Sequence, residues 1–224
     1  MTGAVRPAGL LLDLDGTLVH SEPVHRKTWR HFFDVWGAEV DDSQYEQAFM
    51  GRRASDVLAA VPGPWTGRDL GAIQAEMMAH AQTLGHAVET VPGAAELIRR
   101  ATDAGVPVAV VTSAGPSWAE EVLGPVLDVR DRVTVLVTAE DVTTGKPSPE
   151  GYLRGSERLG LDPADCAGVE DSASGIRALL AAGAGSVVGV TTTSSAADLL
   201  AAGAHRAVPD LRDPWLIGLV TGAG

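Results

Sequence analysis

The sequence predicts an α/β protein with a doubly wound parallel sheet and a small all-helical domain inserted after the first strand. Two observations support this fold class. From residue 91 to residue 208, short apolar runs alternate with helical patterns, as in a parallel sheet covered by helices. Residues 18–88 lack that alternation and carry helical patterns only. We therefore expect one domain of residues 1–17 and 89–224, and a helical domain of residues 18–88.

The first strand is expected at residues 10–12, an apolar run between Gly9 and an Asp-rich turn that is too short for a helix. Similar apolar runs predict strands at residues 106–111, 133–137, 166–169, 187–190 and 206–208. Between them, helices are expected at residues 94–103, 117–127, 149–159, 174–182 and 195–202. Glycines that follow three of these patterns, Gly105, Gly160 and Gly183, indicate helix ends.

The inserted segment begins with an aromatic stripe. Trp29, Phe32, Phe33 and Trp36 fall at i, i+3, i+4 and i+7, the apolar face of an amphipathic helix that ends at Gly37. Such a stripe is more typical of helix packing than of a ligand site. Further helical patterns lie at residues 43–49, 55–60 and 69–84.

Composition restricts the partners and the compartment. The 29 acidic residues outnumber the 17 basic ones, for a formal net charge of -12, which disfavours nucleic acids and anionic membranes as partners. The single cysteine, Cys166, excludes an intramolecular disulfide and favours a reducing compartment. The N-terminus lacks the apolar core of a signal peptide, and no run reaches the length of a membrane span. We expect a cytoplasmic protein that is a monomer or a weak homodimer.

Two carboxylates follow the first predicted strand, in the segment Asp13-Leu14-Asp15-Gly16-Thr17. Open α/β sheets bind their ligands at the carboxyl ends of the strands. At that place Asp13 is a candidate nucleophile, which requires a nearby cation if the target is an anionic phosphate. Asp15 is a candidate general acid and base, and Thr17 offers a hydroxyl beside the pair. An ordinary Asp-rich turn is the alternative.

A second acidic pair, Glu170-Asp171, ends another apolar run. Two acidic pairs at neighbouring strand ends form the hard-oxygen site that Mg²⁺ prefers, so we expect Mg²⁺ as the cofactor. The alternative is that Asp171 or Ser172 merely caps the following helix.

Two further segments offer groups for a phosphate. Lys146 lies in a loop stiffened by Pro147 and Pro149, which would hold its ammonium in place; a plain surface lysine is the alternative. After the run at 106–111, the Ser113 hydroxyl and the Ala114 amide could cradle phosphate oxygens at a helix start, or Ser113 could serve only as a helix cap.

Taken in order along the chain, four segments resemble the motifs of the haloacid dehalogenase-like phosphatases: residues 13–17, 112–114, 145–147 and 170–172. The resemblance covers nearly the whole chain and implies a Rossmann-like core with a helical cap. It implies that Asp13 forms an aspartyl-phosphate, that Asp15 is the acid and base, and that Ser113 and Lys146 bind the phosphoryl group. It also implies Mg²⁺ ligation by Asp13, the carbonyl of Asp15, Asp171 and, directly or through water, Glu170.

Within that family, residues 91–93, 111–113 and 138–142 look most like the sugar- and polyol-phosphate phosphatases, so a small phosphorylated metabolite is the expected substrate. The family also suggests that the cap selects the substrate, which makes His25, Arg52 and Arg53 candidates. For each of them taken alone, the alternative of a solvent-exposed polar residue is favoured.

Two other functions remain open. A β-phosphoglucomutase-like phosphotransferase shares the nucleophile and the metal, and His25 would fit its cap; against it, neither Arg52 nor Arg53 aligns with the basic residue expected after the cap glycine. A non-catalytic sensor of a phosphorylated ligand would be expected to lose a nucleophile or a metal carboxylate, and this chain has lost neither.

Overall fold

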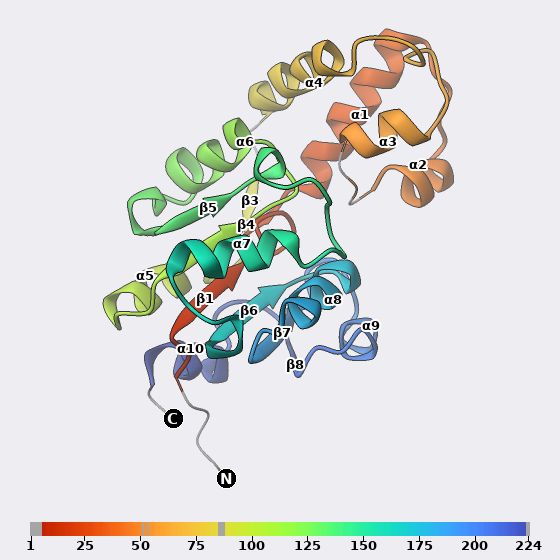
Figure 1. The fold of residues 1–224 in the computed structure, drawn as a ribbon. Coiled ribbons are helices and arrows are strands. Elements are labelled where there is room, and N and C mark those ends of the chain that lie inside the picture. Colours follow the sequence, from red (N-terminus) through yellow and green to blue (C-terminus); the bar gives the residue numbers. More distant parts are fainter. Residues whose placement is uncertain (1–5, 51, 53, 85–87, 223–224) are drawn as a thin grey trace. The chain divides into compact units, whose positions relative to one another are not determined.

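The computed structural model describes residues 6–50, 52, 54–84 and 88–222, which form two compact units (Figure 1). One unit contains the described residues up to His20 together with those from Glu89 onward. The other contains those between Ser21 and Val88. The division begins at Ser21 rather than at residue 18 because the short strands β2 (Val19–His20) and β3 (Glu89–Thr90) pair with each other in antiparallel fashion.

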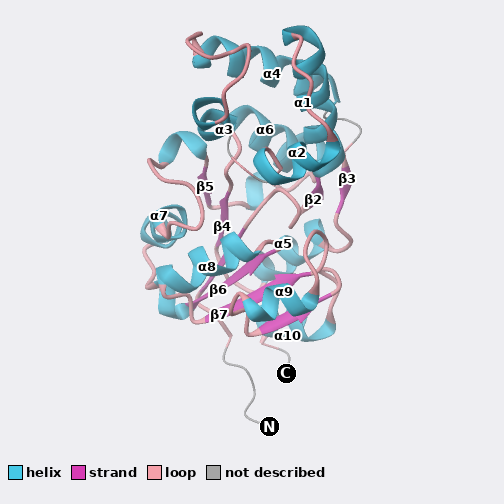
Figure 2. Cartoon of the chain, turned by 90° about the vertical axis from the view of Figure 1, so that its right-hand side faces the viewer, coloured by secondary structure: helices cyan, strands magenta, loops and turns pink. Residues whose placement is uncertain are grey.

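The first unit is built on a six-stranded sheet with the order β5-β4-β1-β6-β7-β8, and every neighbouring pair is parallel. The strands, magenta in Figure 2, are β1 (Gly9–Leu12), β4 (Val108–Val111), β5 (Val135–Val137), β6 (Cys166–Glu170), β7 (Ser186–Val190) and β8 (Arg206–Val208). The predicted α/β class with a parallel sheet is therefore confirmed.

Helices cover both faces of this sheet, as its crossovers require. They are α5 (Ala94–Asp103), α6 (Pro116–Glu121), α7 (Glu150–Leu159), α8 (Ala173–Ala182), α9 (Ala196–Ala201) and α10 (Pro214–Thr221). Helices α7, α8 and α9 lie in the crossover connections from β5 to β6, from β6 to β7 and from β7 to β8. Helix α5 packs on β4 and on α10. Between these layers the three leucines of β1 are fully buried, which explains the continuous apolar run in the sequence.

The helix predicted at residues 117–127 is wrong in its second half. The chain forms α6 and then a π-helical turn over Val122–Val126 that contains Pro125. Proline lacks an N–H, and its ring clashes with the carbonyl four residues back, so a regular α-helix does not continue through it. A wider turn accommodates the proline instead. Helix α10 and the β2–β3 pair were not predicted.

The second unit consists of helices α1 (Glu22–Trp36), α2 (Asp42–Ala48), α3 (Ala54–Ala60) and α4 (Leu70–Leu84). As predicted, the aromatic stripe of α1 packs inward. Trp29 stacks on Phe33 with ring centroids 5.6 Å apart, and Phe49 and the buried Trp65 belong to the same cluster. Among the described residues, none of the helices has both the length and the apolar character needed to cross a membrane.

Candidate active site

The strand register brings the predicted site segments to one edge of the sheet. Leu12 pairs with Val110 on one side and with Val169 on the other, so the segments that follow β1, β4 and β6 leave the sheet side by side. Those segments begin with Asp13, Thr112 and Asp171. Lys146 reaches the same place from the loop before α7.

A buried ion cluster lies at this edge. The ammonium of Lys146 donates to Asp13 Oδ1 and, at 2.7 Å, to Glu170 Oε1. The Lys146 side chain is 13% exposed and that of Glu170 is wholly buried. The ammonium also lies 5.1 Å from the ring centroid of Tyr152, a cation–π contact. These contacts hold the Lys146 side chain in place, whereas a plain surface lysine would extend into solvent.

Both oxygens of Glu170 accept several hydrogen bonds. Oε1 accepts from Lys146 and, at 2.9 Å, from the Tyr152 hydroxyl. Oε2 accepts from the amides of Asp171 and Ser172 at 3.0 and 3.1 Å and from the Ser172 hydroxyl at 3.0 Å. A carboxylate offers about four lone-pair positions. Five donors therefore occupy the acceptor capacity of Glu170.

The charges of the cluster follow from these contacts. Burial would lower the pKa of Lys146, but Asp13 and Glu170 raise it well above its ordinary value, so the side chain is an ammonium. Burial would raise the pKa of Glu170, but Lys146 and the hydrogen bonds hold it below its ordinary value. Burial raises the pKa of Asp13 to about 7, against the lowering effect of Lys146, with Glu170 and Asp15 adding to the rise. Burial, Glu170 and Asp13 raise the pKa of Asp171 well above its ordinary value.

The donor set fits a divalent cation. Carboxylate oxygens of Asp13, Glu170 and Asp171 lie within 4.8 Å of one another. Asp13 Oδ2 is buried and has no hydrogen-bond partner among the described residues. An unpaired buried carboxylate oxygen costs free energy, and three carboxylates exceed the single charge of Lys146. Mg²⁺ takes oxygen ligands and carboxylates, so the residues present are suitable for it.

Asp15 is held by two donors from the β4–α6 segment. The Thr112 hydroxyl donates to Asp15 Oδ2 at 3.1 Å, and the indole Nε1–H of Trp118 donates to Asp15 Oδ1 at 2.9 Å. Trp118 lies in α6 and is buried. Neither donor was among the predicted site residues.

The remaining core candidates lie around these groups. Thr17 is buried, and its hydroxyl donates to Asp171 Oδ1 at 3.4 Å. Ser113 is half-buried in the turn after β4. The Ala114 amide donates to Thr112 Oγ1 at 2.9 Å, so its N–H is already used within the loop. A role for that amide in phosphate binding would have to compete with this bond.

The three residues predicted to contact the substrate belong to the helical unit. His25 is half-buried at the end of the first turn of α1. Arg52 is exposed and donates to the carbonyl of Ala48 at 3.2 Å. Arg53 lies outside the described residues.

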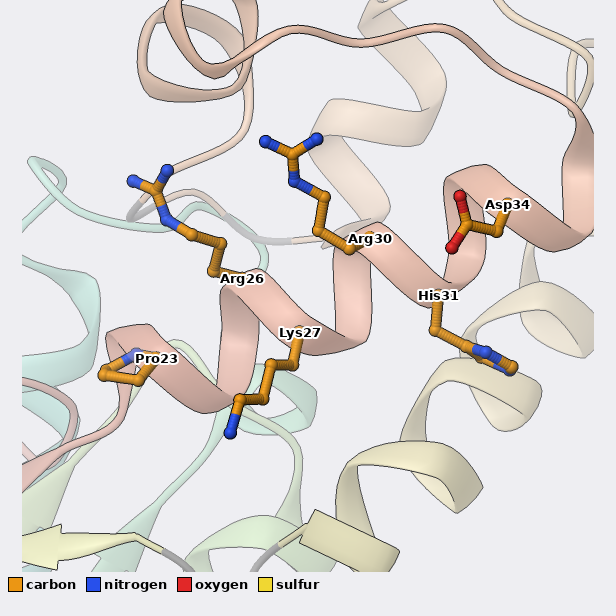
Figure 3. Close-up of a pocket in the computed structure, with 6 residues that line it drawn as sticks. All are labelled: Pro23, Arg26, Lys27, Arg30, His31 and Asp34. Atoms are coloured by element: carbon orange, nitrogen blue, oxygen red, sulfur yellow. The ribbon is translucent and has the colours of Figure 1, made fainter.

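A shallow pocket lies along α1, lined by Pro23, Arg26, Lys27, Arg30, His31 and Asp34 (Figure 3). Arg26 and Arg30 extend to one side of the helix, and Lys27 extends to the other. Both arginines pair with Asp42. Arg26 also pairs with Glu22 and Glu46. The positive charge of the arginines is thus offset within the unit.

Comparison with known proteins gives the family of the chain. The family described as haloacid dehalogenase-like hydrolase matches residues 7–183. Validoxylamine A 7'-phosphate phosphatase of Streptomyces hygroscopicus subsp. limoneus is 38% identical over 83% of this chain and 86% of its own. Hexitol phosphatase A of Escherichia coli K12 is 34% identical over 80% and 81%. The crystal structure of CbbY from Rhodobacter sphaeroides has a TM-score of 0.78 at 23% identity, covering 92% of this chain and 96% of that one, which supports the fold.

Proposed function

Because the chain belongs to the haloacid dehalogenase-like hydrolases and is a phosphatase of that family, we propose that it hydrolyses phosphomonoesters of small sugars or polyols, with Mg²⁺ as cofactor. The observation that carries the proposal is the buried group of Asp13, Lys146 and Asp171, which joins a carboxylate nucleophile, a fixed cation and a second carboxylate for a metal. The substrate class is supported by the two relatives, one named for validoxylamine A 7'-phosphate and the other named a hexitol phosphatase.

The proposed reaction has two steps. An oxygen of Asp13 attacks phosphorus and the bond from phosphorus to the alcohol oxygen breaks, while Asp15 gives its proton to the departing oxygen. Asp15, now a carboxylate, takes a proton from water, and the resulting hydroxide attacks the aspartyl-phosphate. Inorganic phosphate leaves and the Asp13 carboxylate is restored. Lys146 and Ser113 bind the nonbridging oxygens in both steps.

Mg²⁺, held by carboxylate oxygens of Asp13 and Asp171 and the carbonyl of Asp15, would offset the charge shared by the nucleophile and the phosphoryl group. Glu170 would act on this metal through its charge or through water, because its own oxygens already accept five hydrogen bonds. In this proposal the main task of Glu170 is to hold Lys146 and the turn at residues 170–172.

The helical unit is the proposed cap, which would exclude bulk water and select the substrate. His25, Arg52 and Arg53 stay candidates for contacts with the sugar or polyol. His25 is half-buried, so part of its side chain is exposed to solvent. The bond from Arg52 to Ala48 favours a structural part for Arg52.

The test is phosphate release from a panel of sugar, polyol, nucleotide and two-carbon phosphates, with Mg²⁺ and with EDTA. We expect release from a few sugar or polyol phosphates that requires the metal and is lost in Asp13→Asn. The matched control is Asp128→Asn, an exposed aspartate of the same unit with a φ of 53°, a conformation that asparagine tolerates.

Three outcomes would contradict the proposal. Near-normal turnover by Asp13→Asn would remove Asp13 as the nucleophile. Activity confined to nucleotides would remove the substrate class. Activity that appears only with a sugar bisphosphate activator, and without net phosphate release, would establish the phosphotransferase instead.

A further inference from the structure

Two donors to Asp15 among the described residues, Trp118 and Thr112, come from different elements and each bonds to a different oxygen. Trp118 Nε1 donates to Oδ1 at 2.9 Å from α6, and Thr112 Oγ1 donates to Oδ2 at 3.1 Å from the end of β4. Trp118 is 2% exposed and Thr112 is 4% exposed, so both donors are fixed by their surroundings. The carboxyl plane of Asp15 is therefore restrained at both oxygens.

The direction of each hydrogen bond is determined by chemistry. An indole N–H donates and cannot accept. The Thr112 hydroxyl accepts from the Ala114 amide at 2.9 Å, which directs its own proton toward Asp15. In the arrangement that the structure shows, both partners donate to Asp15. They can hold the carboxyl group while its proton goes to another acceptor.

We infer that Trp118 and Thr112 are positioning residues that hold the Asp15 carboxyl in the orientation needed for proton transfer; this rests on the proposed function, in which Asp15 is the acid and base. Trp118 in α6 and Thr112 after β4 are both buried, so each restrains Asp15 from a fixed position. In this proposal the indole acts on the reaction through Asp15. A small misplacement of a catalytic group has a large effect on rate.

The test uses the leaving group of the substrate. The value of kcat/KM includes the steps up to release of the alcohol, in which Asp15 serves as the acid. An alkyl phosphate needs that proton, whereas 4-nitrophenyl phosphate has a good leaving group and does not. For Trp118→Phe we expect kcat/KM to fall by roughly tenfold to a hundredfold with sorbitol 6-phosphate and by about threefold or less with 4-nitrophenyl phosphate.

Trp65→Phe is the matched control. Trp65 is also buried, at 1% exposed, and its indole donates at 2.9 Å, but to the backbone carbonyl of Val61 in the helical unit. Both variants lose a buried indole hydrogen bond, so their losses of thermal stability should be similar. Only Trp118→Phe should discriminate between the two leaving groups. Equal losses on both substrates in Trp118→Phe would overturn the inference.

Thr112 keeps the inference testable if Trp118→Phe does not fold. Thr112→Ser retains the hydroxyl and should retain the wild-type ratio of the two kcat/KM values. Thr112→Val removes it and should show the same discrimination as expected for Trp118→Phe. In NMR spectra of ¹⁵N-labelled protein, the Trp118 indole resonance should shift in Asp15→Asn while that of Trp65 stays in place; an unshifted Trp118 resonance counts against the contact.

The controls separate this inference from the proposed function. If the wild type releases no phosphate, or Asp13→Asn stays active, the proposed function fails. If the wild type is active and Asp15→Asn is impaired, but Trp118→Phe behaves like Trp65→Phe, the proposed function stands and the positioning role fails.

Discussion

The ammonium of Lys146 donates a 2.7 Å hydrogen bond to Glu170 Oε1, and the Lys146 side chain is largely buried while that of Glu170 is wholly buried. Asp13 shares the same ammonium. One positive charge thus serves two buried carboxylates from different strands. Removal of one member of such a group leaves the others as uncompensated buried charges.

Substitution of Lys146 should therefore affect both folding and catalysis. For Lys146→Met we expect the free energy of unfolding of the metal-free protein to fall by about 3–5 kcal/mol, as for other broken buried ion pairs. We expect kcat/KM to fall by about a hundredfold or more, because the cation proposed to bind the phosphoryl group is lost. Urea denaturation and steady-state kinetics measure the two effects.

Lys27→Met is the control, because Lys27 is the only other lysine of the chain. Its side chain is exposed on α1 and has no ion pair among the described residues. The free energy of unfolding of Lys27→Met should differ from that of the wild type by about 0.5 kcal/mol or less. Similar losses of stability in the two lysine variants would contradict the role given to the buried cluster.

Mg²⁺ should stabilise the folded protein, and more so at high pH. The raised pKa of Asp13, about 7 against an ordinary 3.8, favours folding below pH 3.8, and this contribution is lost as the pH rises through 7. A cation that binds the carboxylate offsets that loss. We expect the gain in Tm on adding Mg²⁺ to be larger at pH 8 than at pH 5, and to correspond to about 2.7 kcal/mol at a hundredfold excess over Kd.

Asp171→Asn tests which residues hold the metal. Asparagine relieves the repulsion among three carboxylates, so the metal-free variant should unfold at the same temperature as the wild type or higher. It should lose most of the gain from Mg²⁺, whereas Asp128→Asn should keep it. A full response to Mg²⁺ in Asp171→Asn would exclude Asp171 as a ligand.

Sequence patterns predicted much of the sheet and the acidic groups at its edge. In parallel strands the carboxyl ends share one edge, so placing Asp13 and Glu170 after apolar runs was enough to bring them together. Pro125 indicated a break in the α-helix, but the helical periodicity of its neighbours favoured the prediction of a continuous helix.

Sequence patterns could not predict which side chains form hydrogen bonds with one another. Trp118 and Tyr152 have the spacing and burial of ordinary core residues, and only the tertiary packing directs one indole toward Asp15 and one hydroxyl toward Glu170. The β2–β3 pair could not be predicted from the sequence either, because each of these strands has only two residues, too few to show a periodicity. Long-range contacts of this kind depend on where whole elements pack.

Helix α8 approaches the cluster so closely that a side chain at Gly175 would collide with it. An added Cβ would overlap the Glu170 carboxylate. Alanine is favoured over glycine in a helix by about 1 kcal/mol, but displacement of a buried, hydrogen-bonded carboxylate costs more. We expect Gly175→Ala to lower the free energy of unfolding by about 1–3 kcal/mol and to reduce kcat/KM, since Lys146 would move with Glu170.

Gly124→Ala is the comparison, because a Cβ there would meet nothing within 4 Å. It should change stability by about 1 kcal/mol at most. Thermal denaturation and kinetics of both variants decide the point. If Gly175→Ala were as stable and active as Gly124→Ala, the close approach of α8 to Glu170 would be incorrect.

Glu150 should make the loop that carries Lys146 sensitive to acid. This first residue of α7 accepts hydrogen bonds from the amides of Thr143 and Thr144, from the Thr143 hydroxyl and from Arg154. Those amides, then the hydroxyl and Arg154, lower the pKa of Glu150 to about 2. The stabilisation is therefore present above the ordinary pKa of 4.5 and is lost as the pH falls toward 2.

Glu150→Gln should consequently be less stable than the wild type at pH 7, and the difference should shrink steadily as the pH is lowered from 4.5 toward 2. Its kcat/KM at pH 7 should also fall, because a looser loop holds Lys146 less firmly. Glu157→Gln, on the same helix, removes a carboxylate that makes no hydrogen bond or ion pair among the described residues, and it should match the wild type throughout. Urea denaturation at several pH values measures all three proteins. A stability difference for Glu150→Gln that is constant from pH 7 to pH 2 would mean that the amide contacts, rather than the charge, hold the loop.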